Sequence, residues 1–272
     1  MAIEHFIPEL WEAALLERWV AENVFAALVN REYEGTATKG NTVKITGVVA
    51  PQVKNYKANN RTTSADPITD TEVDLLIDQE KNFDFFVDDI DRAQAAGSFE
   101  AWTEAAGEGL VNDSDQFLAN LMVDEGSTLS GSAPTTGDQA FDVFANANKV
   151  LTKNKAPRTN RVAVINAEFE RLLVGADSKL TSFDTSGDTN GLRNATIGKL
   201  VGFRTVVSLH LPEEDEPQAL FFHQRAAAYV SQLAETEGMR AHDRFADRIR
   251  GLHVYGGKII KPEGVLVFGG GS

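Results

Sequence analysis

The chain has 272 residues, 42% of which are apolar, and its formal net charge at pH 7 is −14. This apolar fraction is typical of a folded globular chain, and no run of about 18 apolar residues predicts a membrane-spanning helix. The absence of cysteine excludes disulfides and thiolate sites. The acidic balance argues against tight, sequence-independent binding of nucleic acid by the whole surface.

The first predicted elements are an arm, residues 2–7, and a helix that ends near Asn30. Pro8 suits the first turn of a helix, and Glu9 and Glu12 would lie at the positive end of the helix dipole. Apolar side chains recur at helical spacing along this segment: Trp11, Ala14, Leu15, Trp19, Ala26 and Val29.

The next segment, residues 36–91, is polar and divided in charge. Residues 36–65 carry only bases, whereas residues 66–91 carry ten acids and the single base Lys81. The bases of the first half are Lys39, Lys44, Lys54, Lys57 and Arg61. Both halves alternate apolar and polar residues, at Val43, Ile45 and Gly47 and again at Phe83, Phe85 and Val87, which predicts the two strands of a long hairpin. Such a hairpin is marginal alone and is expected to lie on something outside itself.

A long helix is predicted after the hairpin, from an N-cap at Asp91 with Gln94 at the third helical position to about Asp124. Gly107 and Gly109 weaken this helix, so a bend or break is expected near residues 107–112. These two glycines are a candidate hinge, and close packing is the alternative explanation for them.

The rest of the chain alternates helix and strand, which favours the α+β class. The predicted elements are a loop at 125–137, a helix at 138–153, a strand at 161–165, a helix capped by Asn166 that runs to about 174, a loop at 177–194, a strand at 200–209, an acidic turn at 212–217, a strand at 219–222, β structure at 229–233 and 243–255, and hairpin-like strands at 258–268.

No pattern of residues predicts catalysis. Asp88, Asp89 and Asp91 are carboxylates close in sequence, but a strand end followed by a helix cap explains them without chemistry. The five histidines lack metal-ligand spacing: His5, His210, His223, His242 and His253. We therefore assign no catalytic residue, cofactor or metal site, and an assembly protein needs none.

Several short motifs, taken in order, resemble the major capsid proteins of tailed bacteriophages, whose fold was first described for phage Hong Kong 97. They are FIPELW at 6–11, GNTVKI at 40–45, FDFFVDDID at 83–91, IGKLVGF at 197–203 with VVS at 206–208 and LP at 211–212, FAD at 245–247, YGGK at 255–258 and PEG at 262–264. Each motif is weak alone, and their order and spacing carry the resemblance.

The resemblance implies a Hong Kong 97-type fold with an N-terminal arm and helix, an extended two-stranded loop (E-loop), a spine helix in a peripheral domain and a mixed α/β axial domain. The implied divisions are 1–35 for the arm and helix, 36–91 for the E-loop, 92–137 for the spine helix, 138–252 for the axial domain with peripheral segments, and 253–272 for the closing strands and tail. Copies would form hexamers and pentamers of an icosahedral head around double-stranded DNA. On this basis Lys54, Lys57 and Arg61 at the loop tip are expected to contact acids of a neighbouring copy.

The same resemblance implies a structural protein of the virion, assembled in the host cytoplasm. Its partners would be other copies of itself, a separate scaffolding protein and a portal, with a decoration protein as a further candidate. An encapsulin-type nanocompartment shell is an alternative within the same fold. A hydrolase using the carboxylates at Asp88–Asp91 is an alternative from a different class.

Overall fold

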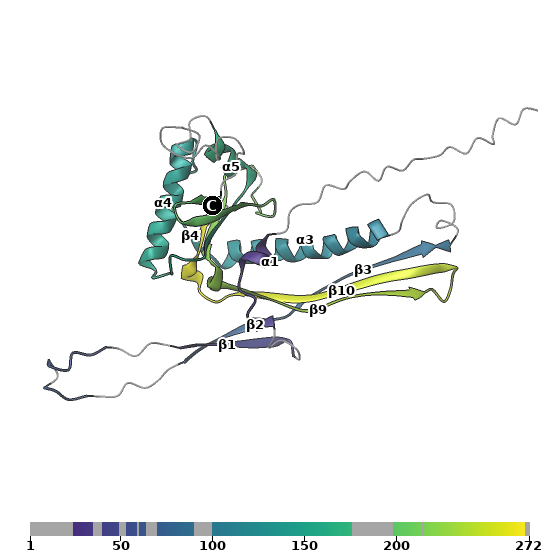
Figure 1. The fold of residues 1–272 in the computed structure, drawn as a ribbon, viewed down its shortest axis with the longest axis horizontal. Helices are drawn as coiled ribbons and strands as arrows, with labels where there is room; N and C mark the ends of the chain where they lie inside the picture. The colour runs from purple at the N-terminus through teal and green to yellow at the C-terminus, as the bar shows by residue number, and fades with distance from the viewer. Residues whose placement is uncertain are drawn as a thin grey trace, which may run out of the picture.

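The computed structural model describes residues 24–34, 40–48, 53–58, 60–63, 70–89, 100–175, 198–213 and 215–269. Within these ranges the chain is α+β, as predicted, and contains a six-stranded, a three-stranded and a two-stranded sheet. The six-stranded sheet and its helices form one unit, the three-stranded sheet extends away from it, and the two-stranded hairpin projects from near their junction (Figure 1). The predicted N-terminal helix falls mostly outside the described residues, which include only its end as α1 (Phe25–Leu28).

The six-stranded sheet is covered on both faces. Its spatial order is β4 (Ser127–Thr128), β11 (Val265–Phe268), β8 (Ala219–His223), β5 (Arg161–Ile165), β7 (Phe203–Val207) and β6 (Lys199–Leu200). Helices α4 (Gly137–Lys153) and α5 (Ala167–Val174) share a core with Ile165 and Phe221, whereas Val164 and Phe222 point into a second core formed with α1. A strand buried on both faces requires a continuous apolar run, which explains the sequence of β5 and β8.

Several local signals in this unit predicted its elements correctly. The predicted helices at 138–153 and 166–174 and the strand at 161–165 are confirmed as α4, α5 and β5. The Asn166 side chain accepts a hydrogen bond from the Phe169 backbone N–H at 3.0 Å, so it caps α5 as predicted. Its amide also donates to the carbonyls of Glu213 and Glu216, which fixes the acidic turn against the helix start.

The three-stranded sheet is long and lies along the spine helix. Its strands are β3 (Gln79–Asp88), β10 (Ala246–Ile259) and β9 (Ala227–Arg240), all antiparallel, with β10 in the centre, and the helix is α3 (Glu100–Glu125). Figure 1 shows α3 running beside this sheet. A Cβ atom added at Gly257 would lie 3.1 Å from Leu118 and 3.2 Å from Leu121, so a glycine in β10 lets the helix approach closely.

The hairpin differs from the prediction in one strand. β1 (Thr42–Val48) pairs with β2 (Asp70–Leu76), whereas the expected returning strand, Phe83–Val87, lies in β3 and pairs with β10. The alternation in β3 was identified correctly, because its odd-numbered side chains are the less exposed ones. The partner was wrong because period-two alternation shows which side chains share a face and carries no information about the neighbouring strand.

The foot of the hairpin is anchored inside its own chain. Val43, Ile45, Leu75 and Ile77 form a small core with Ala228 and Val230 of β9. This corrects the expectation that the whole hairpin needs an outside support, since the described contacts hold its base to β9. Only the part beyond β1 and β2 is left without such a core among the described residues.

Other expectations were wrong in detail. α3 is one continuous helix of 26 residues, so the break expected near residues 107–112 does not occur. The predicted strand 200–209 is a tight hairpin, β6 and β7, with positive φ at Val201 and Gly202. The predicted hairpin at 258–268 is absent from the described fold, because β10 and β11 belong to different sheets. The predicted cap at Asp91 and Gln94 and the loop at 177–194 lie outside the described residues.

Candidate intersubunit surface

The tip of the β1–β2 hairpin brings together the three cations singled out in the sequence. Lys54, Lys57 and Arg61 all lie in an exposed turn. The Asn55 side chain accepts hydrogen bonds from the backbone N–H groups of Lys57, at 3.1 Å, and of Ala58, at 3.2 Å. Arg61 then donates its backbone N–H to the Tyr56 carbonyl at 2.9 Å. An asparagine turn of this kind orders a loop locally, so the tip presents these cations from a defined backbone.

The basic and acidic halves of residues 36–91 meet at an ion pair between β1 and β2. Lys44 of β1 forms an ion pair with Glu72 of β2 at 2.5 Å, and this hydrogen bond raises the pKa of the Lys44 ammonium. Acids further along the chain point elsewhere, because Asp84 of β3 pairs with Arg248, and Asp89, just after β3, pairs with Arg240. The acids of residues 66–91 are therefore divided between two sheets. Those of β2 face the basic strand β1, and Asp84 of β3 faces β10.

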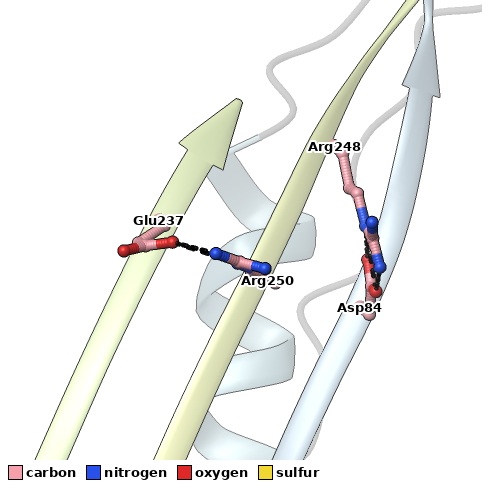
Figure 2. Close-up of polar contacts among 4 residues, drawn as sticks. All are labelled: Asp84, Glu237, Arg248 and Arg250. Carbon is pink, nitrogen blue, oxygen red and sulfur yellow. Dashed lines mark hydrogen bonds and ion pairs between the residues drawn. The ribbon is translucent and has the colours of Figure 1, made fainter. Parts of the chain in front are cut away.

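An ion-pair ladder covers one face of the three-stranded sheet. Figure 2 shows Arg248 of β10 directed to Asp84 of β3, and Arg250 of β10 directed to Glu237 of β9 at 2.6 Å. Arg248 forms the fork geometry that guanidinium and carboxylate groups prefer, and its hydrogen bonds lower the pKa of Asp84. The ladder joins all three strands on a solvent-facing side, where solvent screening leaves each pair only a small contribution to stability.

The outer end of this sheet carries exposed aromatic rings. Phe86 lies under two guanidinium groups, with the Arg244 carbon 4.6 Å and the Arg248 carbon 5.5 Å from its ring centroid. Phe245, in the turn between β9 and β10, is 81% exposed. A large exposed ring at the end of a rigid hairpin is typical of a contact with another protein surface.

A buried carboxylate connects the N-terminal segment to the spine helix. Asp115 of α3 has an exposed fraction of 0% and accepts hydrogen bonds from the backbone N–H groups of Val24, Phe25 and Ala26. The distances to Phe25 and Ala26 are both 3.0 Å. These N–H groups are the unsatisfied donors at the start of α1, so one side chain 90 residues away completes the helix end.

A second polar contact joins β10 to the spine helix. The Tyr255 hydroxyl donates to Asp113 at 2.6 Å, and Lys81 lies 3.5 Å from the same carboxylate. Burial is the first cause, and Asp113 the second, that raises the pKa of the Tyr255 phenol. His253 contacts the Ser231 hydroxyl at 3.0 Å, and burial lowers the pKa of its imidazole. Both groups are thereby held neutral, which suits a packed junction.

Of the two candidate hinge glycines, Gly109 is exposed on the spine helix and Gly107 is partly exposed. A Cβ atom added at Gly107 or Gly109 would meet nothing within 4 Å. Close packing inside the described part of the chain therefore gives no reason for glycine at either position.

One of the carboxylates considered for catalysis takes part in an ion pair. Asp89 accepts hydrogen bonds from Arg240, which also contacts Asp247, and Asp91 lies outside the described residues. Across the described ranges, no group of three or more His, Cys, Asp or Glu side chains is arranged to hold a metal ion. No helix in the described part is both long and apolar enough to cross a membrane.

Two features of this surface were missed from the sequence. The arginines that pair with β3 lie about 160 residues later, at Arg240 and Arg248, and only the strand pairing brings them near their acids. Asp115 was missed although a signal was present, because it shares a helix face with Leu118 and Met122, both fully buried. A carboxylate within an apolar stripe at helical spacing indicates a buried hydrogen-bond acceptor.

Comparison with known proteins identifies the class. A solved structure titled "Mycobacterium phage Che8" is 58% identical, covers 98% of this chain and 98% of that chain, and superposes with a TM-score of 0.90. "Capsid structure of the Cyanophage P-SCSP1u" is 16% identical over 95% of this chain and 91% of that one, with a TM-score of 0.78, and so is similar in fold alone. No curated protein sequence matches the chain. The fold and the projecting surfaces define a shell-forming protein of the tailed-phage capsid class.

The family follows from the sequence match. The family described as "P22 coat protein - gene protein 5" matches residues 14–213, which is more than half of the chain. The chain belongs to the P22 coat protein family. It is a phage major capsid protein with the Hong Kong 97-type fold, and copies of it form the virion shell, as the motifs predicted.

Proposed function

We propose that the chain assembles as hexamers and pentamers of an icosahedral head that encloses the double-stranded DNA of a tailed phage, with its E-loop lying across a neighbouring copy. The observation that supports this most is the tip of the β1–β2 hairpin. All the described residues from Val53 to Thr63 are exposed, although their backbone is ordered by the Asn55 turn. A projecting ordered segment without its own core is expected to gain its stability from a partner surface.

The assignment as a structural protein rather than an enzyme is part of this proposal. Its support is the use of the polar side chains described above, which cap helices, join strands and tie the N-terminal segment to the spine helix. We further propose a separate scaffolding protein, a portal and, as an additional candidate, a decoration protein as partners. The divisions at 1–35, 36–91, 92–137, 138–252 and 253–272 remain proposals as well.

Electron microscopy of the purified full-length chain tests the proposal directly. We expect closed shells built from hexamers and pentamers, with the hairpin of each copy seated on the next. A chain that stays monomeric at high concentration under all assembly conditions would contradict the proposal. An encapsulin-type shell would instead be found with an enzyme enclosed in place of DNA.

Reversal of two tip charges tests the role of the hairpin. Lys57→Glu with Arg61→Glu is expected to reduce assembly and to change its dependence on salt. The two new carboxylates would repel the acids of the neighbouring copy that the cations attract. Each contact contributes only about 0–1 kcal/mol, but the effect is repeated at every copy of the interface. Light scattering across a series of NaCl concentrations measures both quantities.

The control carries the same change in net charge at another exposed site. Lys149→Glu with Lys153→Glu alters two exposed cations of α4 and is expected to leave the salt dependence near that of the wild type. Unchanged assembly and salt sensitivity in the Lys57 and Arg61 variant would remove the proposed contact.

The hinge proposal for the spine helix predicts that one double variant is more stable than the wild type and yet expands more slowly. Gly107→Ala with Gly109→Ala is expected to stabilise α3 by about 1 kcal/mol per site, because alanine is the better helix former and no clash follows. If these positions must bend during shell maturation, the same variant expands slowly or not at all. Time-resolved scattering of shells during expansion measures the rate.

Gly238→Ala is the matched control for the hinge, because a Cβ atom at this glycine of β9 also meets nothing within 4 Å. Normal expansion of the Gly107 and Gly109 variant would show that the spine helix does not act as a hinge there.

A further inference from the structure

A groove lined by cations lies between α1 and the β6 edge of the six-stranded sheet. One cavity of about 520 Å³ is bordered by Arg158, Arg161, Lys199 and Arg204, and the apolar Leu28 of α1. A second cavity, of about 460 Å³, adjoins it. Its lining includes Arg31, Glu32 and Arg225, and it shares Ala27, Asn160 and Gln224 with the first. The shared residues make the two cavities one continuous groove, which we call the basic groove.

The strand pairing concentrates these charges. Lys199 of β6 is directly opposite Arg204 of β7, Arg204 is level with Val162 of β5, and the neighbouring Arg161 is level with His223 of β8. Like charges directly opposite each other in a sheet are destabilising. In a chain with 40 acidic and 26 basic residues, a row of cations at one sheet edge is unfavourable unless something negative binds there.

The positive field is not neutralised within the described part of the chain. There, no ion pair is formed by Arg158, Lys199, Arg204 or Arg225. Burial, and after it the charge of Arg158, lowers the pKa of Arg161. Burial, and after it the charge of Arg225, lowers the pKa of the His223 imidazole. Both pKa values are thus lowered first by burial and then by a neighbouring arginine of the groove.

The innermost cation is held by neutral acceptors only. The Arg161 guanidinium donates to the carbonyls of Pro157, at 2.8 Å, and Ala156, at 2.7 Å, and to the Thr152 hydroxyl at 3.2 Å. It also donates to the Asn148 side chain. These bonds fix the position of the guanidinium without cancelling its charge, so Arg161 adds a permanent positive charge to the floor of the groove.

The turn that carries two of the cations is strained. Val201, between Lys199 and Arg204, has φ +49°, a left-handed conformation that is unfavourable for a β-branched residue, and Gly202 follows at φ +86°. The Asn148 amide donates to the Val201 carbonyl at 3.0 Å and helps to hold this turn. Backbone strain of this kind persists where the surrounding structure requires a particular geometry and is often found at binding sites.

We propose that the basic groove binds a carboxylate-bearing segment of a second copy of this chain, and that this contact helps to join copies in the shell. The inference rests on the proposed assembly of the chain. The groove is concave and partly apolar, with Ala27, Leu28 and Val162 beside the cations, which suits the side chains of a protein segment. A DNA duplex presents mainly phosphate groups at its surface, which would meet the cations but not the apolar side chains of the groove. Every neighbouring copy, with its 40 acids, supplies carboxylates.

Assembly of the nuclease-treated full-length protein tests the contact in the absence of DNA. Arg204→Gln with Arg225→Gln removes two exposed cations and is expected to lower the fraction sedimenting as particles by about tenfold at low salt, the effect of losing charge-assisted contacts at each interface. This variant is also expected to show a weaker salt dependence of assembly than the wild type. Lys149→Gln with Lys153→Gln on α4 is the control and should assemble as the wild type does.

A high-resolution map of wild-type particles gives an independent answer that needs no variant. We expect a carboxylate of another copy within hydrogen-bond distance of Arg204 or Arg225.

Lys199→Gln with Arg158→Gln, at exposed positions of the groove, replaces the first variant if that one unfolds. Normal assembly of both variants, or a map in which no carboxylate of another copy reaches the groove, would overturn the proposal. Normal assembly with reduced retention of DNA would also overturn it and would assign the groove to phosphate groups. Failure of the wild-type chain to form particles would instead contradict the proposed function itself.

Discussion

Replacing Asp115 with alanine is expected to lower the free energy of unfolding by about 3 kcal/mol, because it leaves buried backbone donors without an acceptor. The wild-type carboxylate accepts from Val24, Phe25 and Ala26, and its exposed fraction is 0%. For a chain of this size the loss corresponds to a fall in the melting temperature of about 6–12 °C. Thermal unfolding of the unassembled protein, followed by circular dichroism, measures it.

Two further variants separate the hydrogen bonds from other effects. Asp115→Asn keeps the shape and one acceptor oxygen, so an intermediate loss is expected. Glu108→Ala removes an exposed carboxylate from the same helix and should change the melting temperature little. Equal melting temperatures for Asp115→Ala and the wild type would show that α1 does not depend on this acceptor.

Replacing Gly256 with alanine is expected to displace the foot of the projecting hairpin. The added Cβ atom would lie 2.1 Å from the Leu76 carbonyl oxygen and 2.8 Å from the Ile77 Cα. Both are backbone atoms, which cannot move aside as a flexible side chain can. Overpacking of this kind costs about 1–3 kcal/mol, and here the cost is expected at the upper end because β2 itself must shift.

Hydrogen exchange of the β2 amides and thermal unfolding together measure this change. Faster exchange along β2 is expected, with a lower yield of shells, because the hairpin would leave the chain at a different angle. Gly238→Ala in β9, where a Cβ atom meets nothing within 4 Å, is the control. Wild-type exchange in β2 of the Gly256→Ala variant would show that the close approach is unimportant.

The elements that were predicted correctly depend on local sequence. The helix α5 was identified with its cap because Asn166 acts on a backbone N–H three residues away. The alternation of β3 and the apolar run of β5 likewise depend on neighbours in the chain. The spine helix was expected to break because glycine is a poor helix former, but packing of Leu118 and Met122 in the core stabilises its second half.

The elements that were not predicted depend on distant partners. β3 pairs with β10 from about 160 residues away, and nothing in the alternation of Phe83 and Phe85 identifies that partner. The turn at Val201 was missed because valine is rare where φ is positive. Of the candidate site, the common location of Lys54, Lys57 and Arg61 on an exposed turn agrees with expectation, whereas their contacts on a second copy remain a prediction.

One strand links the two projecting parts of the molecule. The first half of β10 carries Arg248 and Arg250 of the ion-pair ladder, and its second half holds the glycines against which the hairpin foot and the spine helix pack. Because β10 pairs with β9 almost to its end and with β3 as far as Tyr255, we expect a displacement at its outer end to reach the base of the hairpin about 10 residues away. We therefore expect that a copy bound at the outer end of the sheet would alter the angle at which the hairpin meets another copy.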